Sequence, residues 1–138
     1  MSKYREGLAP NSPIDNTPQV GAIIDRINYN GSVDFIISAG TLTTAAATFT
    51  PKIEHGDAAD LSDAQVVNTP ARGLKGTIAA ATFNGTKSNT AYVISYAGIK
   101  RYCRLTITPA GNLGAAALTA AVYIGKPIYS LGTQATEP

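Results

Sequence analysis

The stretch that decides the fold class is residues 89–109, N-T-A-Y-V-I-S-Y-A-G-I-K-R-Y-C-R-L-T-I-T-P. Residues 89–96 and 101–108 are rich in β-branched and aromatic side chains, and a short Ala-Gly turn separates them. Along the second run Cys103, Leu105 and Ile107 alternate with polar or charged residues, so one face of this strand is apolar. The stretch therefore predicts two β-strands, the second with one face in a core.

Short β-rich runs with Gly, Pro and Asn between them recur along the rest of the chain. Asn30-Gly31 separates the runs at residues 22–29 and 32–40 and favours a type I′ turn, so we expect these two runs to form a hairpin. Pro51 lacks a ladder donor, which predicts an edge or a bulge at that position. No segment keeps a helical period, because Thr, Gly and Pro interrupt the Ala-rich parts. We expect an all-β fold, an antiparallel β-sandwich of the jelly-roll type. The additional predicted strands are residues 22–29, 32–40, 45–55, 76–83 and 117–124.

The N-terminal segment, residues 1–19, has a different character because its three prolines lie among short polar side chains. Proline removes a backbone donor and fixes φ, so we expect an extended N-terminal arm in place of a strand or helix. Such an arm is either disordered or ordered along a neighbouring molecule. A chain of 138 residues is the size of one domain. We expect a single β-sandwich domain over residues 20–131 and a C-terminal tail over residues 132–138.

The chain has few charged residues, and they are unevenly distributed. They make up 14% of the sequence, against roughly 25% in ordinary globular domains, which suggests that a partner covers part of the surface. A small β domain coated with Thr and Asn would have the same composition. The net charge of +2 divides into −4 over residues 1–63 and +6 over residues 64–138. These halves form two faces of opposite sign if they stay separate, whereas a sandwich would interleave them.

A single cysteine excludes an internal disulfide. Cys103 shares the apolar face of its predicted strand, so we expect a buried thiol in the core. The only histidine, His55, belongs to another strand or loop, and nothing else near Cys103 in sequence could act as a base. We therefore expect no enzymatic activity and no cofactor.

The segment after His55 contains the aspartates Asp57, Asp60 and Asp63. Their spacing does not match a calcium-binding loop, and one histidine without a cysteine partner cannot build a structural zinc site. We expect a solvated acidic loop in which Asp60 or Asp63 caps a turn, with no metal.

The basic half mixes cations with tyrosines, notably around Lys100, Arg101, Tyr102 and Arg104. This mixture could neutralise a nucleic acid, but the cluster is sparse and no nucleic-acid-binding motif accompanies it. Tyr and Arg are also enriched at protein–protein hot spots, which favours a protein partner and no direct nucleic-acid contact. No apolar run approaches the roughly 18 residues of a membrane helix, and no signal peptide is recognisable. We expect no membrane contact and synthesis in the cytoplasm.

The order of several short sequence words resembles a family of small virion proteins of tailed phages. The words are "SAGTL", "ATFT", "IE.GD" and "LSDA", then "Y.G.KRY.RLTITP.GN", then an apolar run ending in "GKP". They span residues 32–128. The chain in this respect is similar to the cement, or decoration, proteins of short-tailed and related phage heads.

This resemblance implies a small jelly-roll-like protein on the outer surface of the capsid that bridges major capsid subunits and stabilises the shell against the pressure of packaged DNA. It implies self-association, as a homodimer or alternatively a trimer, and it brings no catalytic residue. An alternative from a different class is a receptor- or carbohydrate-binding jelly roll of a head fibre or tail. The partner-contact residues that we predict are Tyr4, Arg5, Asp57, Asp60, Lys100, Arg101, Tyr102 and Arg104.

Overall fold

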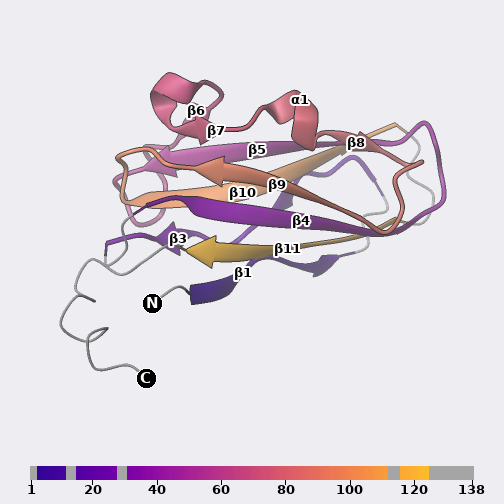
Figure 1. Cartoon of the computed structure of the whole chain (residues 1–138), viewed down its shortest axis with the longest axis horizontal. Helices are drawn as coiled ribbons and strands as arrows, with labels where there is room; N and C mark the ends of the chain where they lie inside the picture. The colour runs from indigo at the N-terminus through magenta and orange to yellow at the C-terminus, as the bar shows by residue number, and fades with distance from the viewer. Residues whose placement is uncertain (1–2, 12–14, 28–30, 112–115, 125–138) are drawn as a thin grey trace.

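The computed structural model of the chain describes residues 3–11, 15–27, 31–111 and 116–124. Two antiparallel sheets enclose one apolar core, a β-sandwich-like arrangement that confirms the predicted all-β class (Figure 1). The first sheet has the order β1-β11-β4-β9-β7; the second has the order β2-β10-β5-β6, with β3 on β10 and β8 on β5. The elements are β1 (Lys3–Asn11), β2 (Gln19–Val20), β3 (Ile24–Asp25), β4 (Val33–Leu42), β5 (Thr48–Gly56), β6 (Gln65–Val67), η1 (Pro70–Arg72), β7 (Leu74–Lys75), α1 (Ile78–Ala81), β8 (Phe83–Asn84), β9 (Thr90–Tyr96), β10 (Tyr102–Ala110) and β11 (Ala116–Ile124).

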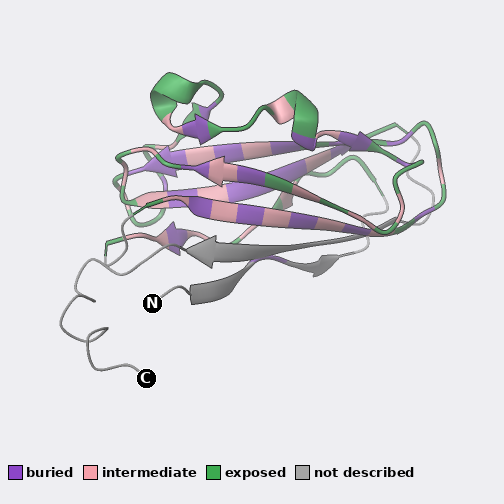
Figure 2. Ribbon diagram, viewed as in Figure 1, coloured by how far each residue is buried: buried purple, intermediate pink, exposed green. Residues whose placement is uncertain are grey.

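The core follows from the alternation of side chains along the long strands, visible as alternating bands in Figure 2. In β10 the side chains of Cys103, Leu105 and Ile107 are buried, as the period-two pattern predicts. β4 contributes Phe35 and Ile37 from the opposite sheet. Since both sheets direct one face inward, neither is stable without the other, and the core of the sandwich joins them.

β5 lies between β10 on one side and two short strands on the other. β8 pairs opposite the start of β5, and β6 pairs opposite Ile53 to His55. Pro51 falls in the gap between these two short strands, while its other neighbour is Ile107 of β10. A missing backbone donor costs least where no strand needs it, so the predicted local edge at Pro51 is confirmed.

The predicted hairpin between residues 22–29 and 32–40 is wrong. β3 pairs with β10 in the second sheet, whereas β4 pairs with β9 and β11 in the first. Residues 28–30 lie outside the described part of the chain, and Gly31 has the positive φ of 95° that a turn requires. An Asn-Gly signal predicts a reversal of the chain, but it does not determine whether the flanking strands pair with each other.

The prediction of an arm without strands is wrong for Lys3–Asn11. This segment is β1, which pairs antiparallel with β11 from Lys3 opposite Ile124 to Asn11 opposite Leu118. β1 is an edge strand, and the register shifts between Leu8 and Asn11, around Pro10. Edge strands and irregularities are the places in a sheet that tolerate proline, which explains why composition misled the prediction.

The segment from β6 to β8 runs along one side of the two sheets and alternates between them (Figure 1). The strand predicted at residues 76–83 is wrong: α1 occupies Ile78–Ala81, and the hydroxyl of Thr77 accepts a hydrogen bond from Ala80 N at 3.1 Å to cap it. Helices in the described residues are limited to such single turns, and none could span a membrane.

On the other side, the backbone of β1 approaches the second sheet closely. Ala22 N donates to Gly7 O at 3.0 Å and Gly21 N donates to Leu105 O at 2.8 Å. A Cβ on Gly21 would lie only 2.1 Å from Gly7 O. Glycine is therefore required at this position, since the close approach of the two sheets leaves no space for a side chain.

Candidate functional site

The predicted basic residues lie together at one end of the sandwich, where the β9–β10 turn meets β3 and the end of β5. Arg101 forms a bidentate ion pair with Asp25, with nitrogen–oxygen distances of 2.9 and 2.8 Å. The Lys100 ammonium pairs with the carboxylate of Asp57, which lowers the pKa of Asp57. The guanidinium of Arg101 also stacks over the ring of Tyr102, 4.9 Å from its centroid. Four of the predicted contact residues, Asp57, Lys100, Arg101 and Tyr102, therefore lie close together.

Arg104 lies further along β10 and pairs across the sheet with Glu54. Its Nη2 lies 2.9 Å from Glu54 Oε2, and Lys52 Nζ lies 3.1 Å from Glu54 Oε1. Burial raises the pKa of Glu54, but the hydrogen bonds from Arg104 and Lys52 outweigh it, and the pKa is lowered. Lys100, Arg101 and Arg104 are therefore each matched by an acid from the first half of the chain, so the sandwich interleaves the two charge types here.

The loop after β5 is built by its own aspartates. Asp63 accepts hydrogen bonds from Asp57 N at 2.8 Å and Ala58 N at 3.1 Å, and Asp60 accepts one from Ser62 N at 3.0 Å. These backbone bonds lower the pKa values of Asp63 and Asp60. The predicted turn-capping role of this acidic loop is confirmed. Within the described residues, no group of three or more potential ligands could hold a metal ion.

Tyr4 and Arg5 lie in β1, opposite Tyr123 and Val122 of β11, and their side chains lie outside the described part of the chain. The register continues from Tyr123 to Asp34 of β4 and then to Ser95 of β9. β11 and β4 therefore separate these two residues from the β9–β10 turn, although all of them lie toward the same end of the first sheet.

A buried polar cluster that sequence reasoning missed holds the β9–β10 turn in place. The hydroxyl of Tyr96 accepts a hydrogen bond from Lys100 N at 3.0 Å and lies 2.8 Å from His55 Nδ1. Arg26 packs over the Tyr96 ring, and its Nη1 donates to Gly98 O at 2.8 Å and to Lys100 O at 2.7 Å. Because three side chains from three strands or their ends fix one short turn, its conformation is set by the core.

The turn projects one apolar side chain into solvent. Ile99 is 97% exposed, the largest exposure among the large apolar residues described. Arg26 binds the carbonyls of Gly98 and Lys100 on either side of it, Tyr96 binds Lys100 N, and the ion-paired Lys100 and Arg101 follow it in the chain. Single exposed apolar side chains are common on protein surfaces, so it is the fixed conformation of its turn that makes Ile99 a candidate contact for a partner.

The sole cysteine and histidine are direct cross-strand neighbours, Cys103 on β10 and His55 on β5, although they are far apart in sequence. Cys103 is fully buried, as predicted, and burial raises the pKa of its thiol to about 12. His55 is engaged with Tyr96, and burial, with the charges of Lys100 and Arg72, lowers its pKa. Cys103 is therefore a neutral, inaccessible thiol, and both residues pack in the interior of the sandwich.

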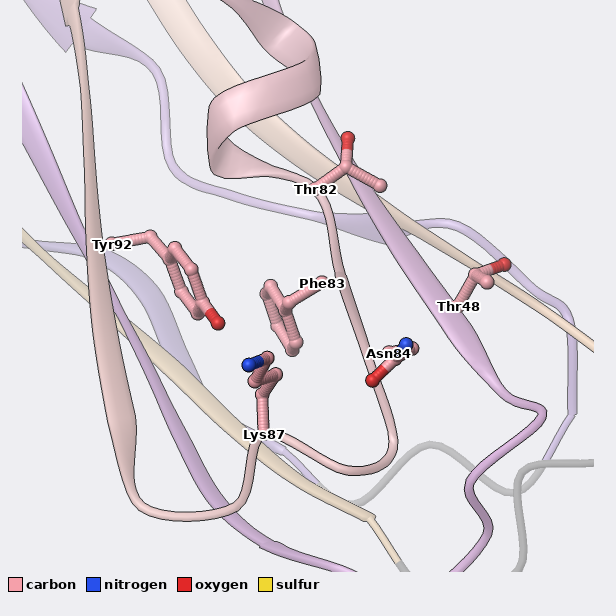
Figure 3. Close-up of a pocket in the computed structure, with 6 residues that line it drawn as sticks. All are labelled: Thr48, Thr82, Phe83, Asn84, Lys87 and Tyr92. Atoms are coloured by element: carbon pink, nitrogen blue, oxygen red, sulfur yellow. The ribbon is translucent and has the colours of Figure 1, made fainter.

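A pocket opens elsewhere, where β8 and the following turn meet β9 (Figure 3). Its volume is about 300 Å³. Two aromatic rings and the side chain of a lysine line it together with amide and hydroxyl groups. Strand alternation alone would have placed Tyr92 on the inner face with Ile94 and Tyr96, but it could not show that Phe83 lies against it. The lining residues are Thr48, Thr82, Phe83, Asn84, Lys87 and Tyr92.

Known proteins give no direct guide to the function. Comparison with protein-family models, curated proteins and solved structures yields no match. The resemblance to phage cement proteins therefore stays a prediction that only experiment can test.

Proposed function

We propose that this chain is a structural virion protein that binds the outer surface of a phage head, bridges major capsid subunits and stabilises the shell. The sequence words that resemble cement proteins support this proposal, as does the β-sandwich-like fold, for which we propose the jelly-roll type. A protein that binds the assembled shell and not its free subunits stabilises assembly by mass action. Repetition over the many symmetric sites of a capsid makes a modest interface effective.

The observation that supports this function best is Ile99 on its fixed turn. A side chain that is 97% exposed gains the most when a partner covers it, and the turn needs no reordering because Tyr96 and Arg26 already hold it. Covering one such side chain contributes roughly 1.5–3 kcal/mol, which is about 10- to 100-fold in affinity. We propose that Ile99 enters a shallow apolar depression on the major capsid protein.

The ion pairs around Ile99 give the proposed interface a polar rim with little free charge. Lys100 and Arg101 are each already paired with an aspartate, so they do not present an unmatched positive face to an acidic partner. Docking should then depend weakly on salt, because exposed pairs are screened and contribute little. Reversing the charge of Arg101 would also leave Asp25 beside a like charge, so it is an ambiguous test of docking.

The proposal is tested by adding the purified chain to undecorated phage heads and counting bound copies. We expect stoichiometry near that of the capsid subunit, and at least tenfold weaker binding for Ile99→Ser. Val93→Ser is the matched control, because Val93 is 59% exposed on β9, away from the turn, and should bind as the unmodified chain does. Binding of only a few copies, or full binding by Ile99→Ser, would contradict the proposal.

Self-association is proposed separately, as a homodimer, with a trimer as the alternative. Sedimentation velocity of the free chain at several concentrations measures the mass directly. A monomer at the concentration needed for decoration would refute this part and leave the docking proposal standing.

The alternative function, a receptor- or carbohydrate-binding module of a head fibre or tail, requires a ligand site on the surface. The pocket between β8 and β9 is the feature that favours it.

A further inference from the structure

The pocket between β8 and β9 combines an aromatic wall with polar side chains, among them Lys87 and the hydroxyl of Tyr92. Its volume of about 300 Å³ lies at the lower end of the range for small-ligand sites, which is roughly 300–1,000 Å³. Figure 3 shows the rings of Tyr92 and Phe83 beside each other, with Lys87 and Asn84 next to them. The site is thus large enough for a small ligand and open to solvent on one side.

The aromatic wall is fixed from the core outward. Phe49 is fully buried and stacks on Phe83 at a centroid distance of 5.1 Å, and Phe83 stacks on Tyr92 at 4.9 Å with the rings 4° from parallel. Three rings in a row leave the outermost one little freedom to rotate. A ligand that contacts Tyr92 or Phe83 therefore meets a surface that is already ordered.

The turn on the opposite wall is equally fixed. Asn84 Oδ1 accepts hydrogen bonds from Thr86 N at 3.1 Å and from Thr86 Oγ1, and Asn84 O accepts one from Lys87 N at 3.1 Å. Gly85 N donates to Ala47 O at 2.9 Å, and a Cβ on Gly85 would collide with the backbone of the neighbouring loop. These bonds hold the oxygen of the Asn84 amide and leave its NH₂ group available to a ligand.

The cation of the pocket differs from those at the β9–β10 turn. Lys100, Arg101 and Arg104 each pair with an acid, whereas no carboxylate among the residues described lies within ion-pair distance of Lys87. The hydroxyl of Tyr92 likewise has no hydrogen-bond partner within the described part of the chain. The pocket therefore offers a free ammonium, an amide donor and a phenol beside an apolar surface.

We propose that this pocket binds a carboxylate-bearing saccharide, such as a uronic acid unit of a surface glycan. A pyranose can place C–H groups against the exposed part of Tyr92, and its hydroxyls can meet Asn84 and Tyr92 while the carboxylate meets Lys87. A nucleobase is a poorer fit, because it binds by stacking over a whole ring face, whereas Phe83 is only slightly exposed between Phe49 and Tyr92 and already covers one face of Tyr92. This ligand class goes beyond capsid binding and does not depend on it.

The test uses the full chain with two probes, methyl β-glucuronide and methyl β-glucoside, and measures saturation-transfer NMR and chemical-shift titration. We expect the glucuronide to bind about tenfold or more tightly than the glucoside, since a charge-assisted hydrogen bond is the difference between them. Lys87→Gln should remove that preference. Lys75→Gln, which removes one positive charge from β7 instead, should preserve it.

A second variant addresses folding directly. Asn84→Asp keeps the side-chain oxygen that Thr86 binds, so the turn should form, but it replaces the amide donor by a like charge and should abolish glucuronide binding. The proposal is overturned if neither sugar binds at millimolar concentration, if both variants bind as the unmodified chain does, or if adenosine monophosphate competes at the same residues with higher affinity. Decoration of heads by Lys87→Gln should be unchanged, which separates this proposal from the capsid role.

Discussion

The β9–β10 turn depends on the hydroxyl group of Tyr96, and Tyr96→Phe removes only this group. The ring is fully buried, so the substitution changes no exposed surface. Two groups lose their partner: Lys100 N, at 3.0 Å, and His55 Nδ1, at 2.8 Å. Since the hydroxyl accepts from Lys100, its own proton can be donated to the imidazole.

The expected cost follows from where these two groups lie. His55 is buried, with 6% of its surface exposed, so an unsatisfied Nδ1 should destabilise the fold by roughly 1–3 kcal/mol. The Lys100 amide is part-buried at a turn and can be hydrated, so its loss adds little. For a domain of 138 residues this corresponds to a fall in Tm of roughly 3–10 °C.

Urea unfolding and calorimetry of Tyr96→Phe measure this cost, with Tyr92→Phe as the matched control. The hydroxyl of Tyr92 has no hydrogen-bond partner in the described chain, so its removal should change the free energy of unfolding by less than about 0.5 kcal/mol. The Tyr96 variant should also decorate heads less well, because Ile99 loses its fixed support. Equal stability of the two variants would refute the view that the Tyr96 hydroxyl holds the turn.

Three further predictions concern the core and its closure. Because burial raises the pKa of Cys103 to about 12, the native thiol should resist iodoacetamide and react only in concentrated urea; labelling of the folded chain would contradict a buried thiol. Burial lowers the pKa of His55, so as the pH falls the unfolded chain binds a proton at this histidine before the folded chain does. The contribution of His55 to the free energy of unfolding should therefore be complete above about pH 6.5 and should decrease as the pH falls below that value. His55→Gln should flatten that decline between about pH 6.5 and 5, before the carboxylates titrate, and an unchanged urea-unfolding profile would show that another group is responsible. Gly21→Ala should cost roughly 1–3 kcal/mol or more and speed amide exchange in β1, because its Cβ would lie 2.1 Å from Gly7 O and 2.7 Å from Leu105 O; unchanged exchange would show that the two sheets can separate without loss.

The strands were predictable where local alternation was strong. The pattern of Cys103, Leu105 and Ile107 identified both β10 and its buried face. Pairing was not predictable, because it depends on contacts between segments far apart in sequence. Asn30-Gly31 signalled a turn before β4, but β3, the strand before that turn, pairs with β10 and not with β4. At Ile78–Ala81 a strand was predicted, but the hydroxyl of Thr77 caps the segment and stabilises a helical turn there.

The candidate site was predictable only in part. The sequence indicated that cations gather near Lys100 and Arg104, but not that Asp57 and Glu54 would neutralise them, since strand order brings the two halves of the chain together. Exposure of Ile99 depends on how the core holds its turn, and no local pattern reports it. The pocket needed the stacking of aromatic rings across elements, which only the three-dimensional arrangement reveals.

The pairing of β1 with β11 has a consequence for biosynthesis. Lys3 lies opposite Ile124, so β1 can complete its ladder only after the chain has been synthesised as far as β11. Until then β1 is an unpaired edge, and contacts of such long sequence separation form slowly. Closure of the first sheet at β1 is therefore a late step in folding, and β1 is open to wrong strand pairing until β11 is available.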